Sequence, residues 1–114
     1  MASITTEAML QHHVQALTSG NMEEFLKDYT EDSVLFTPAE TYKGLEGIKA
    51  GLANIWKMAG PEAVANIKPI KTEFQGEYVY VLWTMPPAIP FGGDLFHIKN
   101  GKIMMQSVVF SAGK

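Results

Sequence analysis

A two-residue turn near the end of the chain constrains its fold more than any other feature. Asn100-Gly101 lies between two apolar runs, residues 91–99 and 102–110. Asn and Gly both tolerate the positive φ that tight hairpin turns require, so this pattern predicts a β-hairpin. The first arm carries one acid, Asp94, among apolar neighbours. Because an unpaired carboxylate is costly to bury, Asp94 must be either solvated or functional.

Composition excludes several classes of function. The 114 residues suit one domain, which we expect to span residues 1–114. There is no Cys, so disulfides and thiolate metal sites are excluded. All nine basic residues are Lys, the net charge is −3 and no basic patch is visible, so we expect no nucleic-acid partner. No apolar run is long enough to span a membrane and no signal peptide is evident, so we expect a soluble, cytoplasmic protein with no membrane partner.

Helical periodicity dominates the first half of the chain. Leu10, Val14 and Leu17 recur at i, i+4 and i+7, which predicts a helix over residues 5–19 that ends at Gly20. A capping-box pattern, Asn21 with Glu24, begins a second helix, and a turn is expected at 30–32. A third helix is predicted over residues 44–58, ended by Gly60-Pro61.

Strand signals fill the remainder of the chain. We expect strands at residues 33–37, near Tyr42, at 63–75 and at 78–85, followed by a stiff Pro-rich connection at 86–90 and the closing hairpin. Pro69 lacks a backbone donor, so its strand belongs at a sheet edge or bulge. Helices segregated against one antiparallel sheet predict an α+β domain. A sheet bent around three helices leaves a conical cavity, which is the usual place for a small-molecule site.

Four segments, in this order and spacing, carry a resemblance to a known family: Val14–Met22, Tyr29–Val34, Tyr42–Ile48 and Gly93–Ile103. The chain resembles the NTF2-like superfamily and, within it, SnoaL-like and ketosteroid-isomerase-like proteins. The resemblance implies an NTF2-like (cystatin-like) cone, with three N-terminal helices packed on a strongly curved, mainly antiparallel sheet. It does not fix an activity, because this fold hosts many unrelated functions.

The resemblance also implies two catalytic candidates. Asp94 matches the acid that, together with a Tyr, forms the oxyanion hole of ketosteroid isomerase. His13 falls where that Tyr would be, and Thr37 falls where the catalytic base would be. Because Thr37 cannot shuttle a proton between carbons at neutral pH, ketosteroid isomerase activity itself is not expected. Whether Glu40, in the loop that follows, replaces the missing base is left open.

The family's inward positions predict a mainly apolar cavity in which His13, Asp94 and Gln106 are the polar groups. Gln106 could contact a ligand or serve a structural hydrogen bond, and both readings stay open. No cofactor or metal is expected, since His12 and His97 lack further ligands. The predicted lining residues are Leu35, Leu52, Ile55, Trp56, Tyr80, Leu82, Phe96, Gln106, Val108 and Phe110.

Alternation along residues 78–85 then places a row of large apolar side chains on the outer face of the sheet: Val79, Val81, Trp83 and Met85. Monomers rarely expose such a row, so we expect a homodimer through this face.

Two functions from different classes remain. The first is a small cofactor-independent enzyme, an isomerase, cyclase or dehydratase, that acts on an apolar oxygenated ring compound with Asp94 as acid or hydrogen-bond donor. The second is a non-catalytic ligand-binding or dimerisation module. In either case the apolar neighbours of Asp94 should raise the pKa of its carboxyl.

Overall fold

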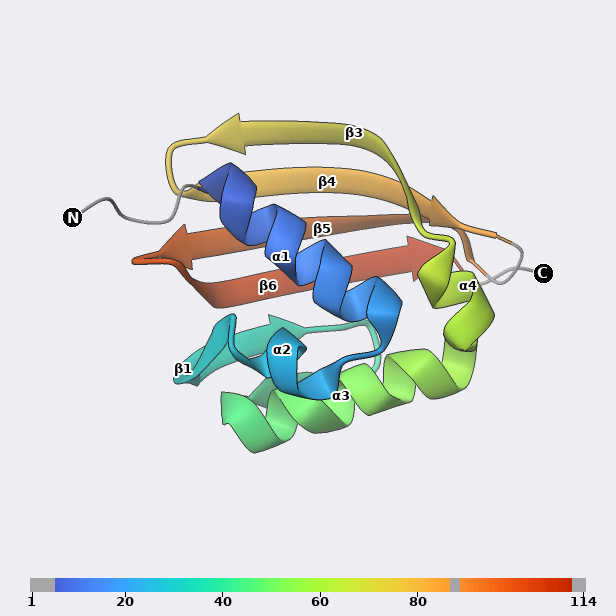
Figure 1. Ribbon diagram of the computed structural model, residues 1–114, viewed down its shortest axis with the longest axis horizontal. Helices are drawn as coiled ribbons and strands as arrows, with labels where there is room; N and C mark the ends of the chain where they lie inside the picture. Colours follow the sequence, from blue (N-terminus) through green and yellow to red (C-terminus); the bar gives the residue numbers. More distant parts are fainter. Residues whose placement is uncertain (1–5, 87–88, 112–114) are drawn as a thin grey trace.

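The computed structural model describes residues 6–86 and 89–111, which form an α+β fold of four helices and six strands (Figure 1). The elements are α1 (Thr6–Ser19), α2 (Met22–Leu26), β1 (Tyr29–Phe36), β2 (Thr41–Lys43), α3 (Gly44–Ala59), α4 (Pro61–Ala65), β3 (Lys68–Gln75), β4 (Tyr78–Met85), β5 (Ile89–Lys99) and β6 (Lys102–Ser111). No helix in these described ranges combines the length and apolar character needed to cross a membrane.

The strands form one curved, open sheet in the order β2-β1-β6-β5-β4-β3. Only the β1–β6 pair is parallel among the described strands. Figure 1 shows α1 lying across the sheet in front of β4, β5 and β6, while α3 runs beside β1. Ile48 and Leu52 of α3 pack with Leu35 of β1 in the apolar core. Within residues 6–86 and 89–111, the helices leave the other face of the sheet uncovered (Figure 1).

The closing hairpin is confirmed. Asn100 and Gly101 have φ of 53° and 74°, so both turn residues adopt the positive φ that a two-residue hairpin turn needs. β5 and β6 pair with Asp94 opposite Val108. β5 begins at Ile89, earlier than the expected arm, and so takes in part of the predicted Pro-rich connection. Residues 87 and 88 of that connection lie outside the described residues.

Three boundaries differ from the sequence predictions. Residues 61–65 form the helix α4 instead of the start of a strand, because Pro61 suits a first helical position and Ala63 and Val64 are buried. β3, at the edge of the sheet as Pro69 predicts, therefore begins only at Lys68. The predicted turn at 30–32 lies inside β1, where the Thr30 amide donates to Ser33 Oγ at 2.8 Å and the strand register shifts.

The orientation predicted for β4 is wrong. Trp83 and Met85, expected on the outer face, are 4% and 3% exposed, and Val79 is fully buried. Tyr80, expected in the cavity, is instead 43% exposed, and Leu82 lies half-buried on the same outer face. The cause is the pairing of Trp83 with Gly92 on the neighbouring strand β5.

Trp83 lies opposite Gly92 of β5, where a Cβ would come within 2.4 Å of the indole ring. Only a residue without a side chain leaves room there, so the glycine sets which face of β4 turns inward.

This contact generates a stability prediction. Gly92→Ala should lower the free energy of unfolding by about 2 kcal/mol, because the new methyl group forces the buried ring of Trp83 to move. Gly47→Ala is the matched control, since its Cβ would meet α3's neighbour Tyr42 at an ordinary 3.4 Å and alanine favours a helix. Urea unfolding of both variants measures the difference. Equal stabilities would contradict this account of β4.

Candidate functional site

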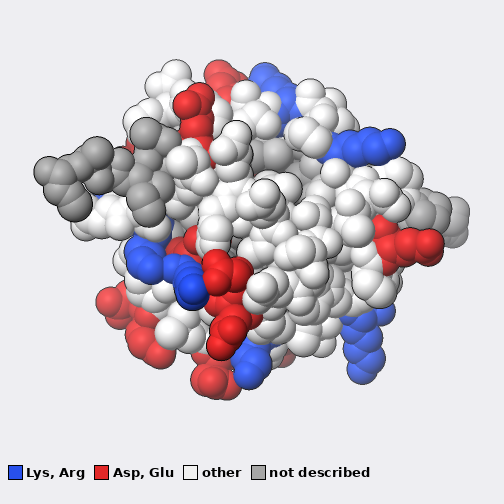
Figure 2. All heavy atoms as spheres, in the orientation of Figure 1, with Lys and Arg blue, Asp and Glu red and all other residues white. Residues whose placement is uncertain are grey.

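A cavity of about 600 Å³ lies between α1 and the strands β3, β4 and β5. Leu10, Val14 and Leu17 of α1 line it, which explains why Val14 is 41% exposed although it belongs to the apolar stripe. The neighbouring side of the helix, with Met9, His13 and Ala16, is buried in the core. The remaining lining residues are Gln11, Gln15, Thr18, Ile67, Pro69, Thr72, Val81, Trp83, Asp94 and Phe96. The wall is therefore mainly apolar. Figure 2, which shows the side of the molecule with α1, has a largely uncharged centre beside a group of acidic and basic side chains.

The cavity predicted from the sequence is a different and much smaller space. An inner void of about 50 Å³ is lined by six of the predicted residues: Leu35, Leu52, Ile55, Gln106, Val108 and Phe110. Side chains fill most of this volume. Phe96 lines only the larger cavity, Trp56 lines neither, and Tyr80 and Leu82 lie on the outer face. The two spaces share five lining residues, among them Trp83, whose ring the inverted orientation of β4 places inside.

His13 and Asp94, the two predicted catalytic residues, line both spaces together with Trp83. They come from α1 and β5, which the fold brings face to face. Asp94 and Trp83 are diagonal neighbours on one face of the sheet, because Trp83 pairs with Gly92, two residues before Asp94. The sequence analysis had placed Trp83 on the opposite face. The Gly92-Gly93 pair was the signal that could have corrected it.

The carboxyl group of Asp94 is held in an unusual state. Burial raises its pKa to about 7, while interactions with the Gln106 amide and the Trp83 indole oppose that rise in part. The residue keeps some accessible surface toward the cavity, but its Oδ1 is buried and has no hydrogen-bond partner among the described residues. Trp83 Nε1 likewise has none, so the indole acts on the carboxyl by proximity rather than through a well-formed hydrogen bond. Asp94 is thus half-protonated near neutral pH, in the direction that the sequence predicts.

Tyr29, the first residue of β1, is a buried polar residue that was not among the predicted site residues. Its hydroxyl donates to Gln106 Oε1. Burial raises the pKa of Tyr29 well above its usual value, and the negative charges of Asp94 and Asp28 add to the rise, so the hydroxyl stays protonated. Because Gln106 Oε1 accepts this bond, the Gln106 NH₂ group is left to act on Asp94. Gln106 therefore has a structural partner and also lines the inner void.

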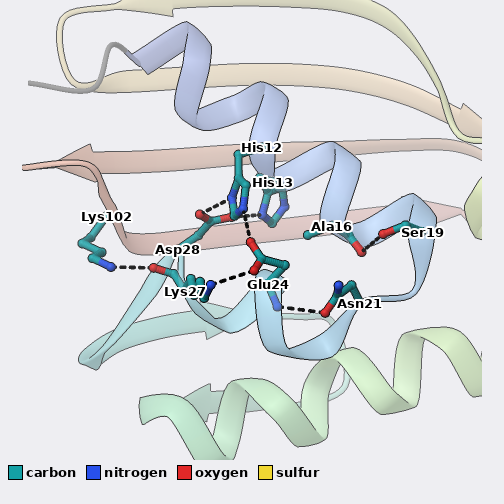
Figure 3. Close-up of polar contacts among 9 residues, drawn as sticks. All are labelled: His12, His13, Ala16, Ser19, Asn21, Glu24, Lys27, Asp28 and Lys102. Carbon is teal, nitrogen blue, oxygen red and sulfur yellow. Dashed lines mark hydrogen bonds and ion pairs between the residues drawn. The ribbon is translucent and has the colours of Figure 1, made fainter.

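The two adjacent histidines of α1 both approach one buried acid, Asp28 (Figure 3). Asp28 was not among the predicted site residues. His12 Nδ1 is 2.7 Å from Asp28 Oδ1, and its Nε2 is 2.9 Å from Glu24 Oε1. Both contacts raise the pKa of His12, and the contact with Glu24 has the larger effect. His13 Nδ1 is 3.8 Å from Asp28 Oδ2, and its ring packs against Phe25 and Phe96. Only His13 of the pair reaches the cavity.

Thr37, at the position of the family's catalytic base, lines neither of the two spaces that Asp94 and His13 share. Thr37 Oγ1 donates to the backbone carbonyl of Glu40 at 2.7 Å, and Thr37 lines a separate cavity of about 530 Å³ beside α3. The side chain of Glu40 is exposed and is absent from the linings of these three cavities. His97 lies on the outer face, 2.9 Å from Glu77, as its alternation with Asp94 predicts. In the described ranges no three His, Asp or Glu side chains converge as metal ligands.

Residues 10–105 match the family model of the SnoaL-like domain. The chain belongs to this SnoaL-like family. No functionally curated protein matches the sequence.

Solved structures share the fold of the SnoaL-like chain at low identity. A SnoaL-like protein of unknown function from Burkholderia thailandensis is 12% identical with a TM-score of 0.77, over 96% of this chain and 99% of that one. A protein with a ketosteroid isomerase-like fold from Catenulispora acidiphila, in complex with trimethylamine, is 17% identical with a TM-score of 0.74, over 94% and 88%. A putative polyketide cyclase from Sinorhizobium meliloti is 15% identical with a TM-score of 0.73, over 88% and 92%.

The raised pKa of Asp94 predicts a pH-dependent stability. The folded chain holds this proton up to about pH 7, whereas the unfolded chain releases it near 3.8. The free energy of unfolding should therefore fall by about 4 kcal/mol as pH rises between those values and then level off. Asp94→Asn should remove this component. The measurement is urea unfolding of both proteins from pH 4 to 8. Parallel curves for the two proteins would show that Asp94 is an ordinary solvated acid.

Proposed function

We propose that this chain binds an apolar ring compound that carries an oxygen, in the 600 Å³ cavity, and that Asp94 acts on that oxygen as acid and hydrogen-bond donor. One observation supports this most directly: a carboxyl group with a pKa near 7 lies on the wall of a mainly apolar cavity. Such a combination of an apolar pocket and a perturbed titratable group is typical of active sites.

The chemistry that fits is proton transfer without a cofactor. An acid whose pKa lies near the working pH can donate a proton and take one back with little energetic penalty in either direction. A ketone oxygen that accepts a hydrogen bond from neutral Asp94 becomes more polarised, which acidifies the neighbouring C–H bonds. Isomerisation, cyclisation and dehydration reactions that proceed through an enol or enolate begin this way. The putative polyketide cyclase among the structural neighbours is consistent with this class of reaction.

His13 is the second polar group at the cavity. Asp28 lies against its Nδ1, so a carboxylate faces one side of the imidazole while the other groups around the ring are aromatic. The approach of Asp28 is too long for a hydrogen bond, so the carboxylate and the aromatic rings together orient the imidazole without fixing its tautomer. We assign His13 the role of accepting a proton from the ligand, in place of the base position now occupied by Thr37.

The alternative is a binding protein without catalysis. Thr37 and Glu40 lie apart from Asp94, so the acid-base pair of ketosteroid isomerase is not reproduced. In this case Asp94 and His13 would only recognise the ligand's polar end.

Hydrogen exchange in a simple ketone separates the two candidates. β-Tetralone is a bicyclic, mainly apolar ketone whose α-protons exchange with deuterium when its oxygen is polarised and a base is near. In D₂O at pH 7 the wild type should accelerate loss of the α-proton NMR signal, and Asp94→Asn should reduce that acceleration about 100-fold. Glu40→Gln, which changes an exposed carboxylate outside the cavity, should leave the rate unchanged.

The outcomes are distinct. Failure of β-tetralone to bind the wild type, measured by NMR shift changes, would overturn the proposed pocket. Binding with no acceleration of exchange would support the non-catalytic alternative.

We further propose that the outer face of the sheet pairs with a second copy of the chain. The corrected orientation of β4 places Tyr80 in a row with Leu95 of β5 and Phe36 of β1, all more than a third exposed. Further exposed side chains on this face are Tyr78, Phe91 and Val109. Six large apolar side chains exposed on one sheet face are typical of an interaction surface, and a symmetric pair would cover them.

Tyr80→Glu should shift a dimer toward monomer, since each copy would bring a charge into the middle of the contact. Ala50→Glu, an equal change of charge at an exposed position of α3, should not. Sedimentation velocity at micromolar concentration measures both. A monomeric wild type would contradict the proposal.

A further inference from the structure

Three residues that line the cavity carry a buried polar atom without a hydrogen-bond partner among the described residues: Trp83, Asp94 and His13, whose Nδ1 is 3.8 Å from Asp28. Trp83 is 4% exposed, and its Nε1–H has no hydrogen-bond partner in the described part of the chain. Asp94 Oδ1 is also buried and also lacks a hydrogen-bond partner among the described residues. Most buried donors and acceptors in proteins are paired, and leaving one unpaired costs stability. An unpaired donor and an unpaired carboxyl oxygen in one wall therefore call for an explanation.

The two groups lie near each other on one face of the sheet. Trp83 is the diagonal neighbour of Asp94 across β4 and β5, and its indole is close enough to lower the pKa of the carboxyl in part. The indole N–H therefore interacts with the carboxyl, but the contact does not reach the geometry of a full hydrogen bond. Both residues line the cavity. One ligand oxygen between them would be within reach of both groups.

The ring of Trp83 is held in place by its surroundings. The backbone of Gly92 lies directly against the ring, with no space for even one methyl group. A donor fixed in this way cannot turn to follow an unsuitable ligand, so it selects for an acceptor at one position.

We propose that Trp83 determines the ligand specificity of this cavity by donating its indole N–H to the same ligand oxygen that Asp94 contacts. The inference rests on the proposed function, and it narrows the ligand class to ketones and their enols. A carbonyl oxygen has two lone pairs, so it accepts from the indole and from the neutral carboxyl at once. A hydrocarbon of the same shape would leave both donors unpaired, and a site built to hydrogen-bond an oxygen rejects such an analogue strongly.

A matched pair of ligands tests the donor. β-Tetralone is compared with its methylidene analogue, in which CH₂ replaces the carbonyl oxygen and the shape is kept. The wild type should bind the ketone at least tenfold more tightly than the analogue. Trp83→Phe keeps an aromatic ring but removes the N–H, and it should reduce that preference about fivefold. Trp56→Phe, at a half-buried tryptophan that lines neither the large cavity nor the inner void, should leave the preference unchanged.

A direct readout on the wild type protects the test from misfolding of Trp83→Phe. The chain has two tryptophans, so the Trp56→Phe variant identifies the indole N–H signal of Trp83 in a ¹H–¹⁵N spectrum. That proton should move downfield when β-tetralone binds and stay in place when the hydrocarbon analogue binds.

Each result decides something different. If neither compound binds the wild type, the proposed function is wrong, and so is this inference, which depends on it. If both bind, but the indole signal is unmoved by the ketone or Trp83→Phe keeps the full preference, the pocket stands and the role of Trp83 is overturned.

Discussion

The architecture of the site depends on one steric contact, that of the Trp83 ring with the backbone of Gly92. A large aromatic ring can occupy the inner face of the sheet here only because the facing residue has no side chain. Since side chains alternate along a strand, placing Trp83 inside also places Val79, Val81 and Met85 inside and turns Tyr80 outward. The contact thus decides both which residues line the cavity and which form the exposed face.

The same ring borders two spaces in the interior of the molecule. It lines both the large cavity beside α1 and the small void under α3, and Asp94 and His13 line both spaces with it. The void measures only about 50 Å³, whereas the large cavity measures about 600 Å³. A ligand of bicyclic size would therefore meet Asp94 from the side of α1.

The polar groups beside Asp94 oppose in part the effect of burial on its carboxyl group. The hydroxyl of Tyr29 holds Gln106, whose amide partly stabilises the carboxylate of Asp94 against the strong effect of burial. On the opposite side, Asp28 draws both histidines of α1 to itself and so orients His13 at the cavity. A carboxyl group can be kept near the midpoint of its titration only by such a balance of burial and partial compensation.

Local sequence determined a large share of this protein. The Asn100-Gly101 turn, the helix that ends at Gly20, the edge position of β3 and the raised pKa of Asp94 follow from nearest neighbours and spacing, because each depends on the backbone preference or polarity of a few adjacent residues. The order of the elements was enough to suggest the family that residues 10–105 match.

Only the tertiary structure decided which face of β4 is buried, where the open volume lies, and that Asp28, Tyr29 and Trp83 join the polar site. An almost continuous apolar strand has no polar face to reveal its orientation. Only the pairing of Trp83 with Gly92 in the folded sheet shows which face is buried. Asp28 and Tyr29 lie next to each other in sequence but far in sequence from Gln106 and Asp94. Contacts of that kind arise from packing between elements, which the spacing of residues along one element does not encode.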